Sequence, residues 1–365
     1  MRSRTRNFIV VAAVAVVIAA IGLAVYLRKR AAPEPARLLP DSDAVLYFNL
    51  KTIRRLTNFG SKAVPQREPE YEQFVRETGF QFERDLNEAA FAVHTVKRPA
   101  PNPDGPETSE LRYSEVFVGK FDSQRLSAYL RKLSKSIDRY KETDIFNIPV
   151  EDRTVRIAIL DMDSVAGSNL DDPSTIRGII DRSRQAALPF AGPPLVSDHY
   201  SKIPIGSLVW ALARIPAAPK DPRAARAFSL PGGIDVLIPS ESTMVAWVRY
   251  LGYVRVHADF YTGSDTDAKR FADQADAFLM LFKSVELGAQ TGTVDPDVRA
   301  VLDSLKVEQD GSRASLTASI PTNFFKKVLE EPPVDVTGAE AAPTEAATPN
   351  STKSPAKKTP AEKRR

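Results

Sequence analysis

Residues Tyr253 to Val285 read YVRVHADFYTGSDTDAKRFADQADAFLMLFKSV. In the first nine residues apolar and polar side chains alternate, which is typical of a strand with one solvated face. From Ser264 the apolar side chains recur every three or four residues, and Ser264 with Asp267 forms an acidic version of a capping box. A strand of this kind followed by an amphipathic helix predicts an α+β fold.

An earlier part of the chain repeats this order. Tyr113 to Phe121 predicts a strand, and Asp122 is suited to cap a helix. That helix has an apolar stripe of Leu126, Tyr129, Leu130, Leu133 and Ile137. Both 113–184 and 253–330 then continue with a hairpin and a helix, the last of which follows Pro321. The repetition predicts two tandem units of antiparallel sheet plus helices, with a single continuous α+β domain as the main alternative.

Composition divides the chain into further segments. The predicted order is a basic N-terminal flank (1–7), a transmembrane anchor (8–27), a linker (28–37), α+β unit 1 (38–188), a proline-rich connection (189–204), α+β unit 2 (205–331) and a tail (332–365). The tail is dominated by Ala, Pro, Thr, Lys and Glu and contains no aromatic residue. Such a composition buries too little apolar surface to offset the entropy of ordering, so we expect it to be disordered.

The predicted anchor is Phe8 to Leu27, a run of twenty residues without a charge. Twenty helical residues cover a hydrocarbon core of about 30 Å. A cleaved signal peptide is the alternative, but it has a shorter apolar region that ends at a small-residue cleavage site. Three basic residues lie on each side of the run, so the balance of charge gives only a weak indication of which end of the helix faces the cytoplasm. We expect the N-terminus in the cytoplasm of a bacterium and the main domain in the periplasm.

The charge distribution argues against nucleic-acid binding. The net charge of the chain is +4. The six bases beside the anchor contribute +6 and residues 340–365 contribute +3, so the rest of the chain carries a net charge of −5. A phosphate-binding surface draws on clustered Lys and Arg, so we expect no nucleic-acid partner. The basic end of the tail could attract anionic lipid or an acidic envelope polymer. The absence of cysteine excludes disulfides and thiolate metal sites.

The start of the predicted folded part resembles a known group of proteins. Residues 39–50 contain Leu39, Pro40, Ala44 and Tyr47 at a spacing that is similar to the opening strand of exported, single-span bacterial proteins of unknown function. The resemblance implies an architecture and an extracytoplasmic address. It implies no catalytic residue, because that group has no assigned activity.

Known catalytic and cofactor motifs are missing from the sequence. There is no phosphate loop, dinucleotide fingerprint, nucleophile elbow or His-Glu-x-x-His helix. The three histidines are weak candidates for a general base. We expect His94 to be a hydrogen-bonded strand residue and His257 to lie on a solvated face with Arg255 and Asp259. His199, beside Asp198, is the one that merits a test under the geometric criteria for an active site.

Four aspartates have a spacing that suggests calcium ligands: Asp161, Asp163, Asp171 and Asp172. A calcium loop starting at Asp161 needs glycine at its sixth position and glutamate at its twelfth, where Ala166 and Asp172 stand. A strand-end turn and a helix cap explain these acids instead. We therefore assign no catalytic, cofactor or metal residues. The sequence favours a non-catalytic binding or scaffolding protein of the cell envelope, with a hydrolase that uses Asp and Glu carboxylates as the alternative.

Overall fold

The computed structural model describes residues 31–57, 68–98, 108–185, 192–217, 227–230, 234–237, 239–288 and 296–322. All of them belong to one unit of the chain, Met1–Glu330. The predicted anchor Phe8–Leu27 and the predicted tail 332–365 lie outside the described residues. Within the described ranges, no helix has the length and apolar character needed to cross a membrane.

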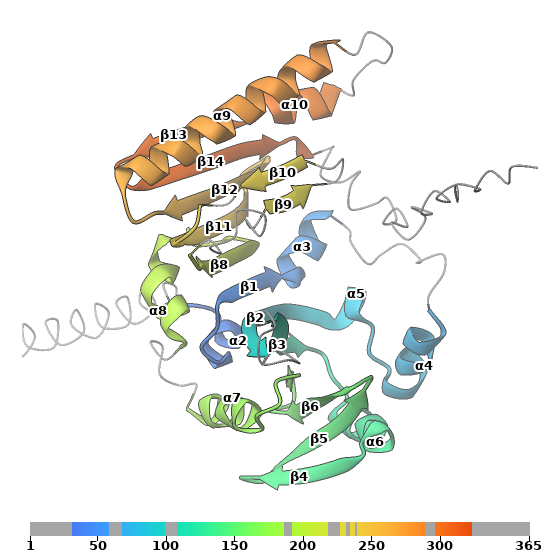
Figure 1. Cartoon of the computed structure of the whole chain (residues 1–365). Helices are drawn as coiled ribbons and strands as arrows, with labels where there is room; N and C mark the ends of the chain where they lie inside the picture. Colours follow the sequence, from blue (N-terminus) through green and yellow to red (C-terminus); the bar gives the residue numbers. More distant parts are fainter. Residues whose placement is uncertain are drawn as a thin grey trace, which may run out of the picture. The chain divides into compact units, whose positions relative to one another are not determined.

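The structure is α+β, as predicted, and is built on an antiparallel sheet (Figure 1). Its strands are β1 (Ala44–Asn49), β2 (Leu86–Arg98), β3 (Thr108–Gly119), β4 (Ser136–Tyr140), β5 (Thr143–Val150), β6 (Arg153–Ile159), β7 (Ser164–Ser168), β8 (Val209–Ile215), β11 (Ser242–Tyr250), β12 (Val254–Tyr261), β13 (Lys306–Asp310) and β14 (Arg313–Ile320). A separate hairpin pairs β9 (Ala227–Leu230) with β10 (Ile234–Leu237). The helices are α2 (Glu34–Leu38), α3 (Leu50–Thr57), α4 (Pro69–Thr78), α5 (Phe82–Asp85), α6 (Ser123–Leu133), α7 (Ser174–Arg184), α8 (Pro194–His199), η1 (Tyr200–Lys202), α9 (Asp265–Gly288) and α10 (Pro296–Ser304).

The twelve strands of the main sheet follow the order β13-β14-β12-β11-β8-β1-β2-β3-β7-β6-β5-β4. Each half begins with three neighbouring strands, β1-β2-β3 or β8-β11-β12, followed by a helix. The chain then adds antiparallel strands from the outer edge inward, and the last of them, β7 or β14, pairs with the third strand, β3 or β12. The two halves meet at β1 and β8, which pair antiparallel from Ala44–Ala213 to Phe48–Val209. The sheet is continuous across the predicted connection 189–204, and the division into two units stays a prediction.

Helices cover both faces of the sheet. We call the face that carries Val45 and Tyr47 face A, and the face that carries Leu46 and Phe48 face B. On face A, Val45 and Tyr47 are buried, with exposures of 3% or less. They belong to a core that also includes side chains of α2, α7 and α8. On face B, α6 packs over β5 and β7, while α9 packs over β12 and β14.

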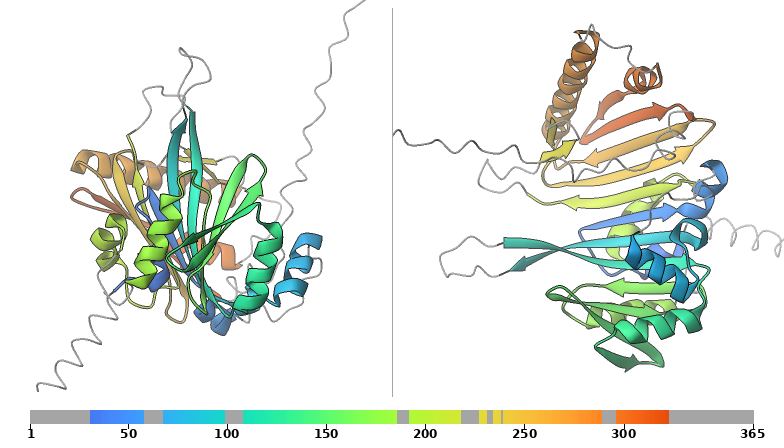
Figure 2. Two further views of the ribbon diagram at one scale, coloured as in Figure 1. Left: turned by 90° about the horizontal axis from the view of Figure 1, so that it is seen from below. Right: turned by 90° about the vertical axis from the view of Figure 1, so that its right-hand side faces the viewer.

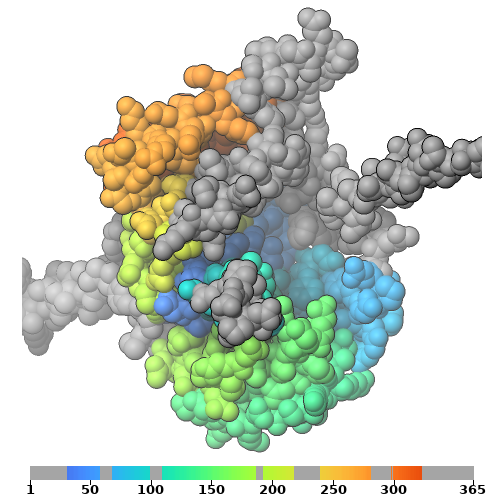
Figure 3. Space-filling model, viewed as in Figure 1, coloured from blue at the N-terminus to red at the C-terminus, as the bar shows by residue number. Residues whose placement is uncertain are grey.

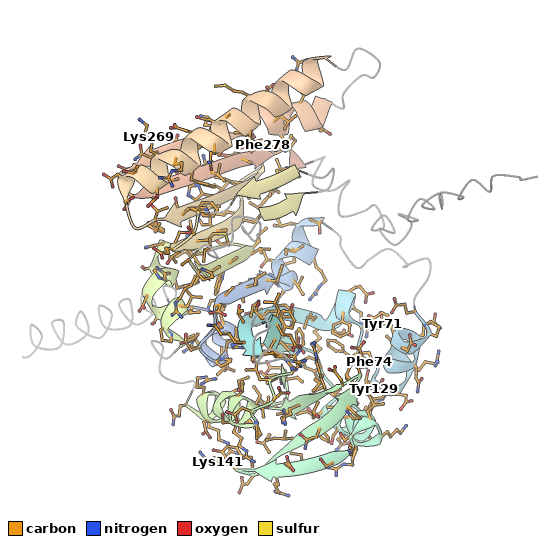
Figure 4. All side chains as sticks on the ribbon, viewed as in Figure 1. Tyr71, Phe74, Tyr129, Lys141, Lys269 and Phe278 are labelled. Atoms are coloured by element: carbon orange, nitrogen blue, oxygen red, sulfur yellow. The ribbon has the colours of Figure 1, made fainter. Side chains whose placement is uncertain are left out.

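Aromatic side chains join α4, α5 and α6 beside the sheet (Figure 4). Phe74 of α4 lies 5.5 Å from Tyr129 of α6 and 5.6 Å from Phe82 of α5, measured between ring centroids. Tyr71 stacks on Phe74 at 6.3 Å. These rings continue the face B core around Phe80, so they stabilise the packing of short helices that bury little surface of their own.

Local signals in the sequence explain several helix boundaries. The Asp122 carboxylate accepts hydrogen bonds from the backbone N–H groups of Gln124 and Arg125, as expected of an N-cap. Ser264 Oγ accepts from Asp267 N at 3.1 Å, which confirms the Ser264 half of the predicted capping box. The hydroxyl donates to Asp267 Oδ2 at 2.7 Å. Helix α4 ends at Gly79, whose φ of 76° suits glycine.

Other boundaries differ from the sequence prediction. The helix after Asp122 ends at Leu133, and Ile137, predicted on its apolar stripe, lies in β4 and packs in the face B core. The acids at 161–163 form a turn, as predicted, but a further strand, β7, follows it. The sequence prediction missed β4 and β7. Each of these strands is only five residues long, so its alternation of apolar and polar side chains is too short to identify.

Candidate functional site

An aromatic row crosses face A in the second half of the sheet. The strand registers align Tyr47 of β1 with Trp210 of β8, Trp210 with Trp247 of β11, and Trp247 with His257 of β12. His257 is in turn aligned with Thr317 of β14. Adjacent strands lie about 4.8 Å apart, so aligned side chains on one face are in contact range.

The rings of this row stack in pairs. Tyr47 and Trp210 have centroids 5.3 Å apart at an interplanar angle of 22°, and Trp247 and His257 have centroids 4.9 Å apart at 27°. Trp210 is 1% exposed, whereas the side chain of His257 is 20% exposed. The row therefore runs from the buried centre of the sheet to accessible rings on β11 and β12. Both tryptophans of the chain belong to it.

Polar groups surround the accessible end of the row. His257 Nδ1 lies 2.8 Å from Thr317 Oγ1, and His257 Nε2 lies 3.1 Å from Asp259 Oδ1. The Asp259 side chain is only 8% exposed, and its Oδ1 atom has no hydrogen-bond partner of suitable geometry. Trp210 Nε1 and Arg255 Nε are also buried without a hydrogen-bond partner among the residues that the structure describes. Buried polar atoms of this kind are rare in folded proteins and are normally matched by water or a ligand.

The short helices before β8 add a cationic group to this face. Tyr200 packs edge-on against Trp210 at 5.5 Å, and Lys202 Nζ lies 3.5 Å from the ring centroid of Tyr261. Burial lowers the pKa of Lys202, and the charge of Asp259 opposes this shift. The ammonium and the carboxylate therefore influence each other across the face. This places a cation, a carboxylate, an imidazole and several rings together.

The three histidines behave differently from one another. His199 Nδ1 lies 3.5 Å from Lys202 Nζ, and burial, followed by the charge of Lys202, lowers the pKa of His199. His257 was expected on a solvated face, but its neighbour Asp259 is buried and Trp247 covers its ring. The sequence showed the alternation correctly. It did not show that β11 would place a tryptophan beside the imidazole.

His94 belongs to a closed polar chain on the other half of face A. Its Nε2 atom lies 3.2 Å from Ser114 Oγ, which lies 3.2 Å from Ser168 Oγ. Burial lowers the pKa of His94. A serine beside a histidine is the pairing of a nucleophile and its base, but Ser114 is 0% exposed and no substrate atom can reach it. The hydrogen-bonded role expected for His94 agrees with this arrangement.

The four aspartates whose spacing suggests calcium ligands have separate structural roles. Asp161 Oδ1 accepts from Met162 N at 2.7 Å, and Asp163 Oδ1 accepts from Ser164 Oγ at 3.0 Å. Asp172 accepts from Ser174 N at the start of α7, and Asp171 pairs with Arg112 at 3.3 Å. In the part of the chain that the structure describes, no three acidic or histidine side chains come together as metal ligands.

Sequence reasoning did not single out Trp210, Trp247 or Lys202. The alternation of β12 does place Arg255, His257, Asp259 and Tyr261 on one face, and the face is correct. The missing information is long-range, because the row depends on pairing between β1 and β8, about 165 positions apart in the chain.

Comparison with solved structures finds a similar fold in TP0453 of Treponema pallidum. Crystal form III of that protein has a TM-score of 0.42 and 8% sequence identity, and the match covers 82% of this chain and 98% of that one. Crystal form IV has a TM-score of 0.39 at 8% identity, covering 81% and 96%. No family model matches the chain, and no curated protein is similar to it. The resemblance carried by Leu39, Pro40, Ala44 and Tyr47 stays a prediction.

Proposed function

We propose that this chain is a membrane-anchored binding or scaffolding protein whose folded part lies outside the cytoplasm. The anchor is the uncharged run Phe8 to Leu27, held between basic flanks. The observation that supports binding is an exposed apolar patch at one end of the sheet. Exposed apolar side chains that gather on a surface mark interaction sites.

The patch lies at the base of a two-stranded arm. Residues 94–98 of β2 pair with 108–112 of β3, past the last partners of both strands in β1 and β7, and the arm projects from the sheet (Figure 2). On face B, Leu111 is 50% exposed and Tyr113 is 41% exposed. Val150, at the same end of β5, is 47% exposed. None of these three side chains belongs to the core cluster that packs around α6.

The edges of the sheet are poor sites for partner strands. The outer strands are β4 and β13, each five residues long, with charged side chains in both. Short, charged edge strands are a common defence against pairing with another chain. We therefore assign partner binding to the exposed apolar side chains Leu111 and Tyr113, with Val150 on the same face three strands away, and not to a strand edge.

A photo-crosslinking amino acid placed at Tyr113 tests this assignment in native membranes. We expect a discrete product with an envelope protein from this position. The matched control is Met162, which is 80% exposed in the turn between β6 and β7. Failure to form any product at Tyr113, or the same products at both positions, would contradict the proposal.

The proposed address has a test of its own. Alkaline phosphatase fused after Arg365 is active only outside the cytoplasm. We expect an active fusion, with the chain recovered in the membrane fraction and released by detergent but not by high salt. An inactive phosphatase together with a bright fluorescent fusion at the same position would reverse the proposed orientation.

An envelope hydrolase remains the second candidate, and two observations favour it. Thr317, His257 and Asp259 place a hydroxyl, an imidazole and a carboxylate in sequence on face A. On face B, burial raises the pKa of Glu115, as in carboxyl groups that act as general acids. Hydrolysis of esters or glycosides by the purified chain, lost in Asp259→Asn or Glu115→Gln, would establish this candidate. Equal background rates for all three proteins would eliminate it.

We further propose that the folded part consists of two tandem units that share the sheet. Each side of the β1–β8 pair begins with three neighbouring strands of the sheet followed by a helix, β1-β2-β3 with α6 and β8-β11-β12 with α9, which supports this division. Residues 1–188 and 189–365, co-expressed as separate chains, should assemble into a complex with the circular dichroism of the intact protein. If the two fragments fail to associate in any expression order, the chain is better treated as one indivisible domain.

A further inference from the structure

Two neighbouring turns lie at the end of the sheet opposite the β2–β3 arm. Residues 204–207 form a turn before β8, and residues 251–253 connect β11 to β12. Leu208 N donates to Val248 O at 2.8 Å, which continues the pairing of β8 with β11 up to the two turns. We call these two segments the paired turns. Because adjacent strands lie about 4.8 Å apart, the paired turns lie side by side.

Each of the paired turns presents large apolar side chains to solvent. Ile205 is 54% exposed, Leu251 is 47% exposed and Tyr253 is 38% exposed. Among the described residues, no atom lies within 4 Å of the position that a Cβ would occupy at Gly206 or Gly252. Both tips therefore project into open space, and exposed apolar side chains that gather in this way mark an interaction site.

The charged side chains next to the paired turns are basic. Helix α3 starts beside the first turn, because Asn49 N at the end of β1 donates to Leu208 O at 2.7 Å, and the helix lies away from the arm (Figure 2). Helix α3, the paired turns and the two residues on each side of each turn contain no acidic residue. The bases are three residues of α3 and an aligned pair on β11 and β12: Lys51, Arg54, Arg55, Arg249 and Arg255.

Acidic side chains at this end of the sheet lie beyond this group of bases. Those of α4 and α5 belong to helices that pack over β2 and β3. The acidic turn 161–163 precedes β7, four strands from β8. Helix α10, with two aspartates against one arginine, packs on β14, one strand beyond β12. Glu88 is on face A, where it accepts a hydrogen bond from Tyr47.

The end of the sheet that carries the arm is richer in acids. Its described connections contain seven acids against a single base, Lys135. The acids are Asp41, Asp43, Glu151, Asp152, Asp171, Asp172 and Glu241. Arginines of the neighbouring strands pair with three of them. An anionic surface is therefore attracted to the paired turns more than to the end where Leu111 and Tyr113 lie.

The proposed anchor holds the folded part against a bilayer. The anchor ends at Leu27, whereas Ala32 already packs against the face A core. Five residues span at most about 17 Å, which is roughly half the length of α9. Part of the protein surface must therefore face the lipid headgroups. Apolar side chains beside bases are the combination that enters the interface of an anionic bilayer.

We propose that the paired turns insert Ile205, Leu251 and Tyr253 into the interface of the membrane that holds the anchor. Lys51 and Arg55, which are both exposed, bind anionic headgroups beside them. This contact rests on the proposed membrane anchor. It leaves the β2–β3 arm, with the exposed apolar side chains at its base, at the end of the sheet that points away from the bilayer.

Single cysteines report on this contact without background, because the chain has no cysteine of its own. Leu251→Cys is labelled with an environment-sensitive NBD fluorophore, and the full chain is reconstituted into nanodiscs of phosphatidylcholine and phosphatidylglycerol. Lipids that carry a nitroxide near the headgroup then quench a probe in the interface. Leu111→Cys is the matched control, because Leu111 is the same residue type and is 50% exposed at the opposite end of the strands. We expect emission at shorter wavelength and about threefold stronger quenching at Leu251 than at Leu111.

Further variants test the apolar and the basic part of the contact separately. With the label at Leu251, Ile205→Ser should reduce the quenching about twofold, and so should Lys51→Gln combined with Arg55→Gln. These changes affect exposed side chains, so the urea midpoint should stay the same. Lys269→Gln is the matched charge control and should leave the quenching unchanged, because Lys269 is exposed on α9, which covers face B (Figures 3 and 4).

Three results would overturn the proposal. The first is a chain that is held by nanodiscs but whose probe at Leu251 is quenched no more than the probe at Leu111, which would leave the anchor intact. The second is an emission shift in detergent that grows with protein concentration, which would assign the paired turns to a second copy of the chain. The third is a chain that nanodiscs do not retain, which would refute the anchor together with the contact that rests on it.

Discussion

Arg112 is the side chain on which the base of the β2–β3 arm depends. Its side chain is 3% exposed, although it carries a full charge. The guanidinium donates to the Asn169 carbonyl at 3.0 Å, and its Nη2 lies 3.3 Å from Asp171 Oδ2. Its Nε lies 3.2 Å from Glu110 Oε1 as an ion pair. We predict that Arg112→Met strongly destabilises the fold.

The magnitude follows from what each partner loses. Asp171 is 81% exposed and returns to water at little cost. Glu110 keeps its ion pairs with Arg98 and Arg153, so it is not left alone. The Asn169 carbonyl loses a charged donor, and loss of such a bond costs about 1.5–3 kcal/mol. Adding the lost attraction to Glu110 in a buried site gives a decrease of about 3 kcal/mol in the free energy of unfolding.

Arg98→Met is the matched control, because Arg98 pairs with the same Glu110 but is 49% exposed. Exposed pairs contribute about 0–1 kcal/mol, so this variant should remain close to the unaltered protein. Urea unfolding followed by circular dichroism measures both, and hydrogen exchange should show faster exchange in the arm of Arg112→Met. Equal costs in the two variants would refute the reasoning that burial sets the value of these pairs.

Three further predictions concern single side chains. Ser264→Ala removes the capping box of α9 and should cost about 1 kcal/mol in urea unfolding, whereas Ser264→Asp should recover most of it. Burial lowers the pKa of His94 from 6.5, so the fold favours the neutral ring. The free energy of unfolding should therefore fall as pH drops below about 6.5. His94→Gln should remove part of this pH dependence, and the part that is due to His199 should remain. Burial raises the pKa of Glu115 from 4.5, so stability is lost as pH rises above that value; Glu115→Gln should be more stable than the unaltered chain at pH 7, with the difference vanishing below about pH 4.5. A denaturation series across pH that shows no difference for either variant would contradict the last two.

The sequence predicted the elements whose signals are local. The cap at Asp122 and the cap at Ser264 each depend on residues within one helical turn. Strands β4 and β7 lack such signals, because five residues allow only two or three alternations. The pairing of β1 with β8 has no local signal at all.

The candidate site also depends on long-range pairing that has no local signal in the sequence. Alternation in β12 places Arg255, His257 and Asp259 on one face, but a face alone does not distinguish a solvated surface from a binding site. The distinction comes from Trp247, which the register of β11 places over His257. A tryptophan more often belongs to a core than to a site, so its presence in the sequence carries little information until its strand has a position in the sheet.

The central strand pair, β1 and β8, lies between a half of face A that is filled by small buried residues and a half that carries aromatic and charged groups. Tyr47 of β1 donates to Glu88 Oε2 at 2.9 Å and stacks on Trp210 of β8, so the hydroxyl is satisfied while the ring joins the two halves. Burial, followed by the charge of Glu88, raises the pKa of this tyrosine, which therefore stays neutral. On face A the small residues Ala90 and Ala92 of the first half pack in the same core as Trp210 and Leu212 of the second. The second half is free to carry charged and aromatic groups, since the buried rings at the join supply the apolar packing that those groups cannot.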